Sequence, residues 1–119
     1  MNWYNTYPVF FSSSSHKKYM RHDSVYYLYR SDRRDKKYMV KHGNRTIHFG
    51  ARGYSDYTLH KDYERMVRYR NRHNVRENWN DLKTAGAWSL HLLWSYTSLG
   101  QAIRQMEKRF GIEIVQRFR

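Results

Sequence analysis

The clearest structural signal in the chain lies in residues 38–49, which read YMVKHGNRTIHF. The central Gly43-Asn44 dipeptide can form the two-residue loop of a β-hairpin. That loop fixes a register with the pairs His42–Arg45, Val40–Ile47 and Tyr38–Phe49. Because side chains alternate along a strand, one face carries Tyr38, Val40, Ile47 and Phe49, and the other carries Met39, Lys41, Thr46 and His48. The sequence therefore predicts a half-buried antiparallel hairpin.

Short segments on either side of the hairpin predict further strands and turns. Residues 25–29 (VYYLY) are β-branched and aromatic, which predicts a strand, and residues 31–35 (SDRRD) predict a turn after it. Gly50 and Gly53 are expected to be turn residues with unusual backbone angles. Residues 112–115 (IEIV) predict a short strand that closes the domain.

Helical periodicity begins near His60 and runs to about Asn74. At about 100° per residue, Tyr63, Met66 and Val67 cluster on one side, which we expect to face the core. The opposite side of this amphipathic helix is basic.

Two further helices are predicted nearer the C-terminus. Residues 87–96 (AWSLHLLWSY) are apolar most of the way round, which predicts a buried central helix. The last helix begins after Ser98, an N-cap residue with Gln101 at the capping-box spacing, and ends at Gly111. Its apolar stripe consists of Leu99, Ile103, Met106 and Phe110.

Together these elements predict an α+β fold, a small antiparallel β-hairpin sheet followed by two or three helices. We expect residues 25–119 to form a single compact domain. Residues 1–24 are aromatic and polar without a helical or strand period, which predicts an extended N-terminal arm.

The composition gives opposite indications about folding. The chain has 119 residues and a formal net charge of +13. Leu, Ile, Val and Phe make up roughly 18% of it, below the rough 20% line at which a highly charged chain is expected to be disordered. However, 12 Tyr and 4 Trp are present. Since a buried aromatic side chain removes a large area from water, these residues can replace the missing aliphatic core.

Several functional classes are excluded or disfavoured by composition. The chain has no Cys, which excludes disulfides, thiolate catalysis and Cys-based zinc sites. No apolar run reaches the ~18 residues of a membrane span, and residues 1–15 do not resemble a secretory signal. We therefore expect a reducing compartment or a particle assembled in one.

A basic stripe lies along the helix predicted to begin near His60. Its five members are Lys61, Arg65, Arg68, Arg72 and Arg76. Five cations on one face favour an anionic partner, and Arg adds bidentate geometry for phosphate. Nucleic acid, an acidic protein surface and lipid headgroups would all satisfy these charges, while a solvated helix face would need no partner.

The N-terminal arm interleaves cations and aromatic rings. The contact residues that we expect there are Lys17, Lys18, Tyr19, Arg21 and Tyr26. Single-stranded nucleic acid suits this mixture, because bases stack on rings while cations follow phosphates. An arm that lies across a neighbouring subunit suits it equally, with the rings as anchors.

Signatures of catalysis are missing from the sequence. No HExxH motif, Gly-rich phosphate loop or GxSxG motif occurs, and the ten acidic residues do not form an evident acid/base pair. His42 and His48 fall on opposite faces of the predicted hairpin, which disfavours a metal site. We therefore predict a protein that is not an enzyme, without metal, cofactor or small-molecule substrate.

A series of linked motifs nevertheless resembles a known family. The motifs are IHFGARGYSDYT at 47–58, His60-Lys61-Asp62 with Arg65, Tyr69 with Arg72-His73, Glu77-Asn78-Trp79, KTAGAWS at 83–89 with Leu92-Leu93-Trp94, and Lys108-Arg109-Phe110-Gly111-Ile112. Over about residues 36–114 the chain resembles a family of short basic proteins coded by large double-stranded DNA viruses of eukaryotes, the nucleocytoplasmic large DNA viruses.

The resemblance implies a viral origin and a non-enzymatic protein, and it carries over no catalytic residue. It leads to two hypotheses. The first is a virion structural protein, a minor capsid component that fastens viral capsid proteins to each other or to the inner membrane. The alternative is a basic protein bound to the viral genome. Expected partners are capsid proteins, with DNA or an acidic membrane surface, in the virion and in the host cytoplasm or viral factory during assembly.

Overall fold

The predicted hairpin is present and keeps its predicted register. In the computed structural model, which describes residues 24–119, β2 (Lys36–His42) and β3 (Arg45–Ala51) pair antiparallel. Val40 lies opposite Ile47 and Tyr38 lies opposite Phe49. Gly43 has a φ of 60°, a left-handed value that favours glycine and closes the two-residue loop.

Two further strands complete a four-stranded sheet with the order β3-β2-β1-β4. β1 (Val25–Arg30) pairs antiparallel with β2, and β4 (Glu113–Gln116) pairs parallel with β1. Both strands were predicted, but the parallel pairing was not. A parallel neighbour requires a long crossover, and here the helices of the chain provide it. The predicted α+β class is confirmed.

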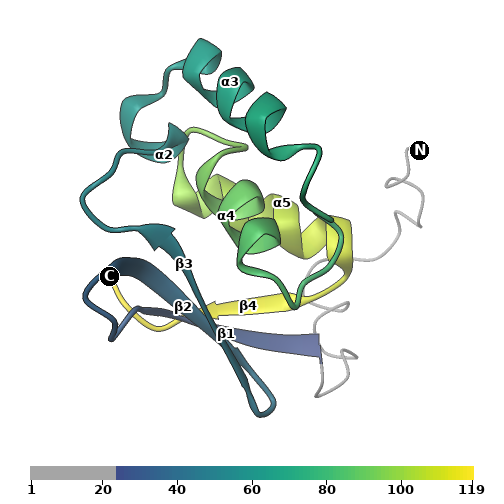
Figure 1. Cartoon of the computed structure of the whole chain (residues 1–119). Helices are drawn as coiled ribbons and strands as arrows, with labels where there is room; N and C mark the ends of the chain where they lie inside the picture. Colours follow the sequence, from purple (N-terminus) through teal and green to yellow (C-terminus); the bar gives the residue numbers. More distant parts are fainter. Residues whose placement is uncertain (1–23) are drawn as a thin grey trace.

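All described helices lie on one side of the sheet (Figure 1). They are α2 (Tyr57–His60), α3 (Tyr63–His73), α4 (Ala85–Leu93) and α5 (Leu99–Phe110). α4 and α5 lie above the strands, and α3 lies farthest from the sheet (Figure 1). The fold therefore places α3 at the outer end of the molecule.

The prediction of one helix that begins near His60 is wrong, because the chain turns there. Lys61 has a φ of 56° in the left-handed region and ends α2. Asp62 then caps α3, since its carboxylate accepts hydrogen bonds from the backbone N–H groups of Glu64 and Arg65. The predicted end of this helix near Asn74 is confirmed.

α4 is the buried central helix, although it begins and ends earlier than residues 87–96. Thr84 is its N-cap, and Leu93 is its last residue. α5 has its predicted ends: Ser98 Oγ accepts from the Gln101 N–H at 3.2 Å, and Gly111 has a φ of 65°. Local capping signals therefore located α5 more accurately than hydrophobic periodicity located α4.

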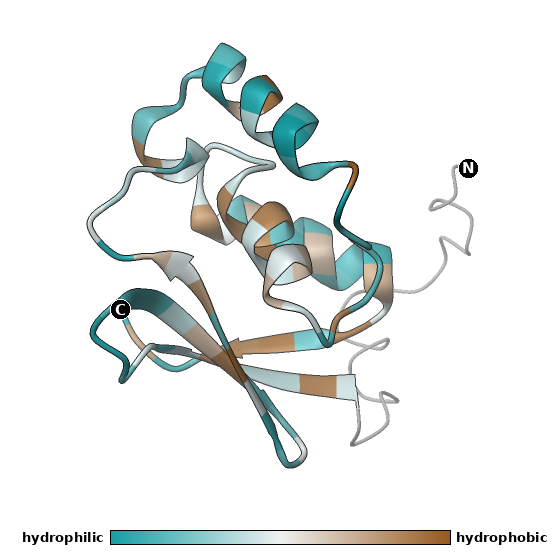
Figure 2. Cartoon of the chain, in the orientation of Figure 1, coloured by the Kyte–Doolittle hydropathy of each residue, from teal (hydrophilic) through white to brown (hydrophobic). Residues whose placement is uncertain are grey.

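The core lies between the sheet and α4, and aromatic residues supply much of it. Trp88 and Phe49 are among its fully buried side chains. The other buried members are Leu28, Val40, Leu92, Leu93, Ala102, Ile103, Met106, Ile112 and Ile114. Figure 2 shows hydrophobic stretches on the strands and on α4, whereas α3 is largely hydrophilic. The aromatic residues compensate for the low aliphatic content within residues 24–119.

One aromatic residue does not have its predicted position. Tyr63 was expected to face inward and is 64% exposed. The inner side of α3 instead carries Met66, which is buried, and Tyr69, which is partly buried. Tyr69 stacks on Trp94 with ring centroids 4.2 Å apart, so this contact sets the rotation of the helix.

Candidate functional site

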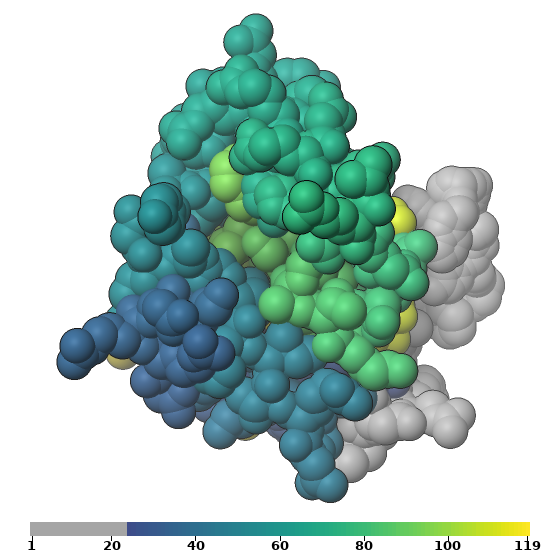
Figure 3. Space-filling model, viewed as in Figure 1, coloured from purple at the N-terminus to yellow at the C-terminus, as the bar shows by residue number. Residues whose placement is uncertain are grey.

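The outer side of α3 carries three of the arginines predicted to bind an anion. Arg65, Arg68 and Arg72 are all exposed, and their helical positions fall within an arc of about 60°. Figure 3 shows the segment that carries α3 forming one end of the molecule, where a large partner can approach it. We call these three residues the arginine face.

Aromatic contacts next to the arginine face fix how α3 is turned. The Tyr69 ring is stacked against Trp94, and its hydroxyl lies 3.3 Å from Ser89 Oγ. Burial raises the pKa of the Tyr69 hydroxyl, so this group stays protonated at neutral pH. His73 also stacks on Tyr69, with ring centroids 4.1 Å apart. The helix is therefore fixed by aromatic packing on one side, and the adjacent side is basic.

No carboxylate within residues 24–119 forms an ion pair with the arginine face. The ion pairs in this part of the chain join Arg33 to Asp35, Lys37 to Asp56 and, at 4.0 Å, His48 to Asp32. The carboxylates of the described part of the chain consequently do not neutralise the positive charge of the arginine face. Three guanidinium groups on a rigid helix can bind a series of phosphates.

Two members of the predicted stripe do not lie on α3. Lys61 sits in the turn before the helix, and its Nζ donates to the backbone oxygens of Thr58 and Thr97, at 2.7 and 3.1 Å. Arg76 is exposed but follows the end of the helix. The stripe of five cations is therefore corrected to a face of three, because the chain turns at Lys61 before α3 begins and because Arg76 lies beyond the end of α3.

The predicted arm contacts fall in two groups. Lys17, Lys18, Tyr19 and Arg21 lie outside the described residues. Tyr26 does not belong to an arm: it is part of β1, where its ring stacks on His42 at 3.9 Å and lies 5.4 Å from Trp88. Strand pairing turns Tyr26 toward the core, so the prediction of an arm contact at this residue is wrong.

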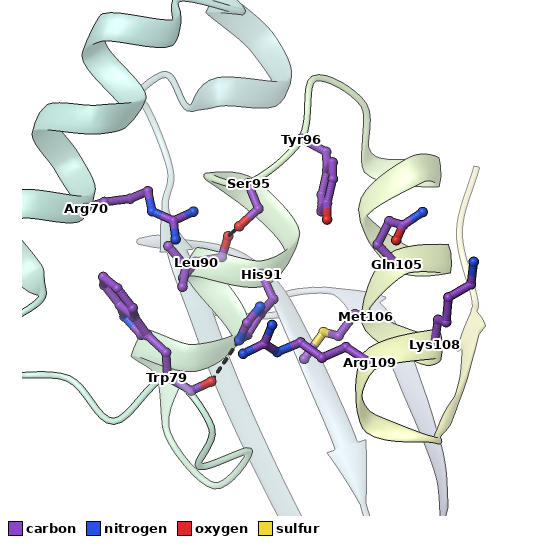
Figure 4. A pocket seen from close by; sticks show the side chains of 10 residues that line it. All are labelled: Arg70, Trp79, Leu90, His91, Ser95, Tyr96, Gln105, Met106, Lys108 and Arg109. Atoms are coloured by element: carbon purple, nitrogen blue, oxygen red, sulfur yellow. Dashed lines mark hydrogen bonds between the residues drawn. The ribbon is translucent and has the colours of Figure 1, made fainter. Parts of the chain in front are cut away.

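A pocket of about 420 Å³ opens between α3, α4, α5 and the loop that joins α3 to α4. Its lining residues are Arg70, Trp79, Leu90, His91, Ser95, Tyr96, Gln105, Met106, Lys108 and Arg109. Figure 4 shows Arg109 reaching toward His91 from α5 and Arg70 extending toward Leu90 from α3. The sequence did not predict this pocket, because its lining residues are spread over 40 positions of the chain. The one signal in the sequence was the mixture of cations and aromatic residues in this region.

The pocket is positively charged and partly aromatic. Among the described residues that line it, none is acidic. The guanidinium carbon of Arg70 lies 5.6 Å from the centre of the Trp79 ring, and Arg109 donates to Asn80 Oδ1 at 3.3 Å. These contacts orient the two guanidinium groups without neutralising them.

His91 is held as a neutral acceptor in this pocket. Its Nε2–H donates to the backbone oxygen of Trp79 at 2.7 Å, because a carbonyl oxygen can only accept. Burial lowers the pKa of His91, and the charges of Arg109 and Arg70 lower it further. The imidazole is thus neutral at pH 7, and its Nδ1 carries the lone pair.

A family model matches the first half of this architecture. The model, described as a family of unknown function (DUF5754), matches residues 26–73. The match runs from β1 to the end of α3 and includes the arginine face, but it covers less than half of the 119-residue chain. No curated protein and no solved structure matches the chain.

A buried carboxylate elsewhere in the matched segment has a structural role. Asp56 is 2% exposed, pairs with Lys37 Nζ and accepts from the N–H of Thr58 at the start of α2. Its bonds connect β2 to α2 and leave no carboxylate oxygen for a ligand. Within residues 24–119, no three His, Asp or Glu side chains come together to hold a metal ion. In the same part of the chain, no helix has the length and apolar character needed to cross a bilayer.

Proposed function

We propose that the chain is a basic binding protein whose arginine face contacts the phosphates of nucleic acid. The observation that carries this proposal is the exposed cluster of Arg65, Arg68 and Arg72 on one rigid helix, without an ion pair to any described carboxylate. The formal net charge of +13 supports it, since a strongly positive protein attracts polyanions over long range.

The test is binding of a fluorescent DNA duplex and a single strand at increasing salt concentration. If the three arginines each contact one phosphate, log K for duplex binding should fall against log salt with a slope of about −3. The triple variant Arg65→Glu, Arg68→Glu, Arg72→Glu should bind the duplex at least tenfold more weakly and keep its circular dichroism spectrum, because all three side chains are exposed.

A matched control separates the arginine face from net charge. Arg34, Arg45 and Arg104 are exposed arginines on other parts of the surface, and their triple replacement by Glu changes the charge by the same amount. We expect this control to bind duplex DNA clearly better than the triple variant of α3. Equal binding by the two variants, or binding that salt does not weaken, would refute the proposal.

The hypothesis of a minor capsid component is supported by a different observation, the resemblance over residues 36–114. It remains a prediction, as do the viral origin, the virion location and the lack of enzymatic activity. Mass spectrometry of purified virions would test it, and the absence of this protein from the particles would exclude it.

A further inference from the structure

The pocket between α3, α4 and α5 points to a second binding site, and we propose that it holds a nucleoside phosphate. The proposal does not depend on nucleic-acid binding by the arginine face. Arg70 occupies a different side of α3 from the arginine face, about 140° around the helix from Arg65. The two sites can therefore be lost separately.

The phosphate end of the ligand is assigned to the two arginines. Arg70 and Arg109 line the pocket from α3 and α5, with the guanidinium group of Arg109 beside His91 and that of Arg70 beside Leu90, the neighbouring residue of α4 (Figure 4). Neither residue forms an ion pair with any carboxylate of residues 24–119. Two guanidinium groups present several N–H donors to one anion, which suits a phosphate group with its multiple acceptor oxygens.

The remaining walls fit the nucleoside. Trp79 and Tyr96 lie on opposite sides of His91, and Leu90 and Met106 add apolar surface (Figure 4). A volume of about 420 Å³ falls within the range of sites for organic ligands and exceeds the need of an inorganic anion. Aromatic and apolar walls favour a planar base, which stacks on rings.

Further polar groups that line the pocket suit the edge of a base. His91 Nδ1 is an acceptor, because Nε2–H is already committed to the Trp79 carbonyl. Gln105 supplies an amide, and Tyr96 supplies a hydroxyl. A purine or pyrimidine offers both donors and acceptors to such a set. A carboxylate ligand without a ring would leave these walls unused.

The experiment is isothermal titration of the full chain with adenosine 5′-monophosphate, adenosine and inorganic phosphate at low salt. We expect the monophosphate to bind more tightly than either of its two parts. Arg70→Gln and Arg109→Gln should each weaken its binding about tenfold, the loss expected for a charge-assisted hydrogen bond. Arg45→Gln on β3 and Arg104→Gln on α5 are the matched controls, since both arginines are exposed and line neither site, and these variants should bind as the unchanged protein does.

A second arm identifies the source of the nucleotide. A short oligonucleotide with a 5′-phosphate is compared with the same strand with a 5′-hydroxyl, in the variant that lacks the arginine face. Stronger binding of the phosphorylated strand, lost on Arg70→Gln, assigns the pocket to strand ends. Binding of the mononucleotide alone assigns it to free nucleotides. Either result supports the proposal.

Three results would overturn it. The first is the absence of saturable binding by the monophosphate to a protein that melts cooperatively. The second is unchanged affinity in both Arg70→Gln and Arg109→Gln. The third is equal affinity for adenosine and its monophosphate, which would remove the role of the phosphate. Tyr96→Phe removes one hydroxyl only, so it tests the pocket even if an arginine variant fails to fold.

Discussion

His91 is a histidine whose protonation state is set by its position in the fold. Burial is the main cause of its lowered pKa, followed by the Arg109 and Arg70 charges, against the opposing hydrogen bond to Trp79. The unfolded chain retains the ordinary value of 6.5, so it takes up a proton first as the pH falls. The folded state therefore loses stability as the pH decreases through 6.5.

We expect the free energy of unfolding to fall between pH 7.5 and 5.5, and His91→Gln to reduce that fall. Gln can still donate to the Trp79 carbonyl but does not titrate. Urea denaturation at the two pH values measures the effect. Some pH dependence should remain, because burial also lowers the pKa of His60. Identical pH dependence in the variant and the unchanged protein would contradict this assignment.

At the scale of elements, Gly50 connects the hairpin to the central helix. It has a φ of 80°, and a Cβ added there would lie 2.8 Å from Leu93 Cδ1 of α4. Gly53, three residues later, has a φ of 93° but open space around it. Both glycines have a positive φ, which disfavours any residue with a side chain. Of the two, only Gly50 is also in close contact with a neighbouring element.

Replacement of these glycines by Ala should separate the two effects. Gly53→Ala should cost about 1 kcal/mol, the penalty for a side chain at positive φ. Gly50→Ala should cost about 1–3 kcal/mol more, because the added methyl group forces the buried Leu93 side chain to repack. Chemical denaturation measures both losses. Equal losses would show that the contact with Leu93 adjusts without cost.

The elements that the sequence predicted well are those with local chemical signals. The Gly43 loop determined the β2–β3 register, and the Ser98 and Gly111 caps bounded α5. The break between α2 and α3 was missed, because Lys61 takes a left-handed conformation without being glycine. The parallel pairing of β4 with β1 depends on the three-dimensional path of the helices, which no local pattern specifies.

The same distinction applies to the candidate sites. Helical spacing predicted the arginine face, because three of the five members of the basic stripe lie on α3. The two errors came from the ends of the helix, where periodicity gives little information. The pocket required Arg70, Trp79, His91 and Arg109 to meet across three helices and a loop, so only the folded chain reveals it.

On the scale of the whole molecule, charge acts in two ways that kinetics can separate. The total charge of +13 sets the long-range attraction to DNA and therefore the association rate. Local contacts at the arginine face set the dissociation rate.

The triple Glu variant of α3 and its control at Arg34, Arg45 and Arg104 each have a formal charge of +7, because three Arg→Glu changes remove six units from +13. Stopped-flow measurements should show that association with DNA is slowed to a similar extent in both variants. Dissociation should become at least tenfold faster in the α3 variant alone, because its lost phosphate contacts together contribute about 1.4 kcal/mol or more. Equal dissociation rates would mean that the bound complex depends on charge anywhere on the surface, and α3 would then have no special role.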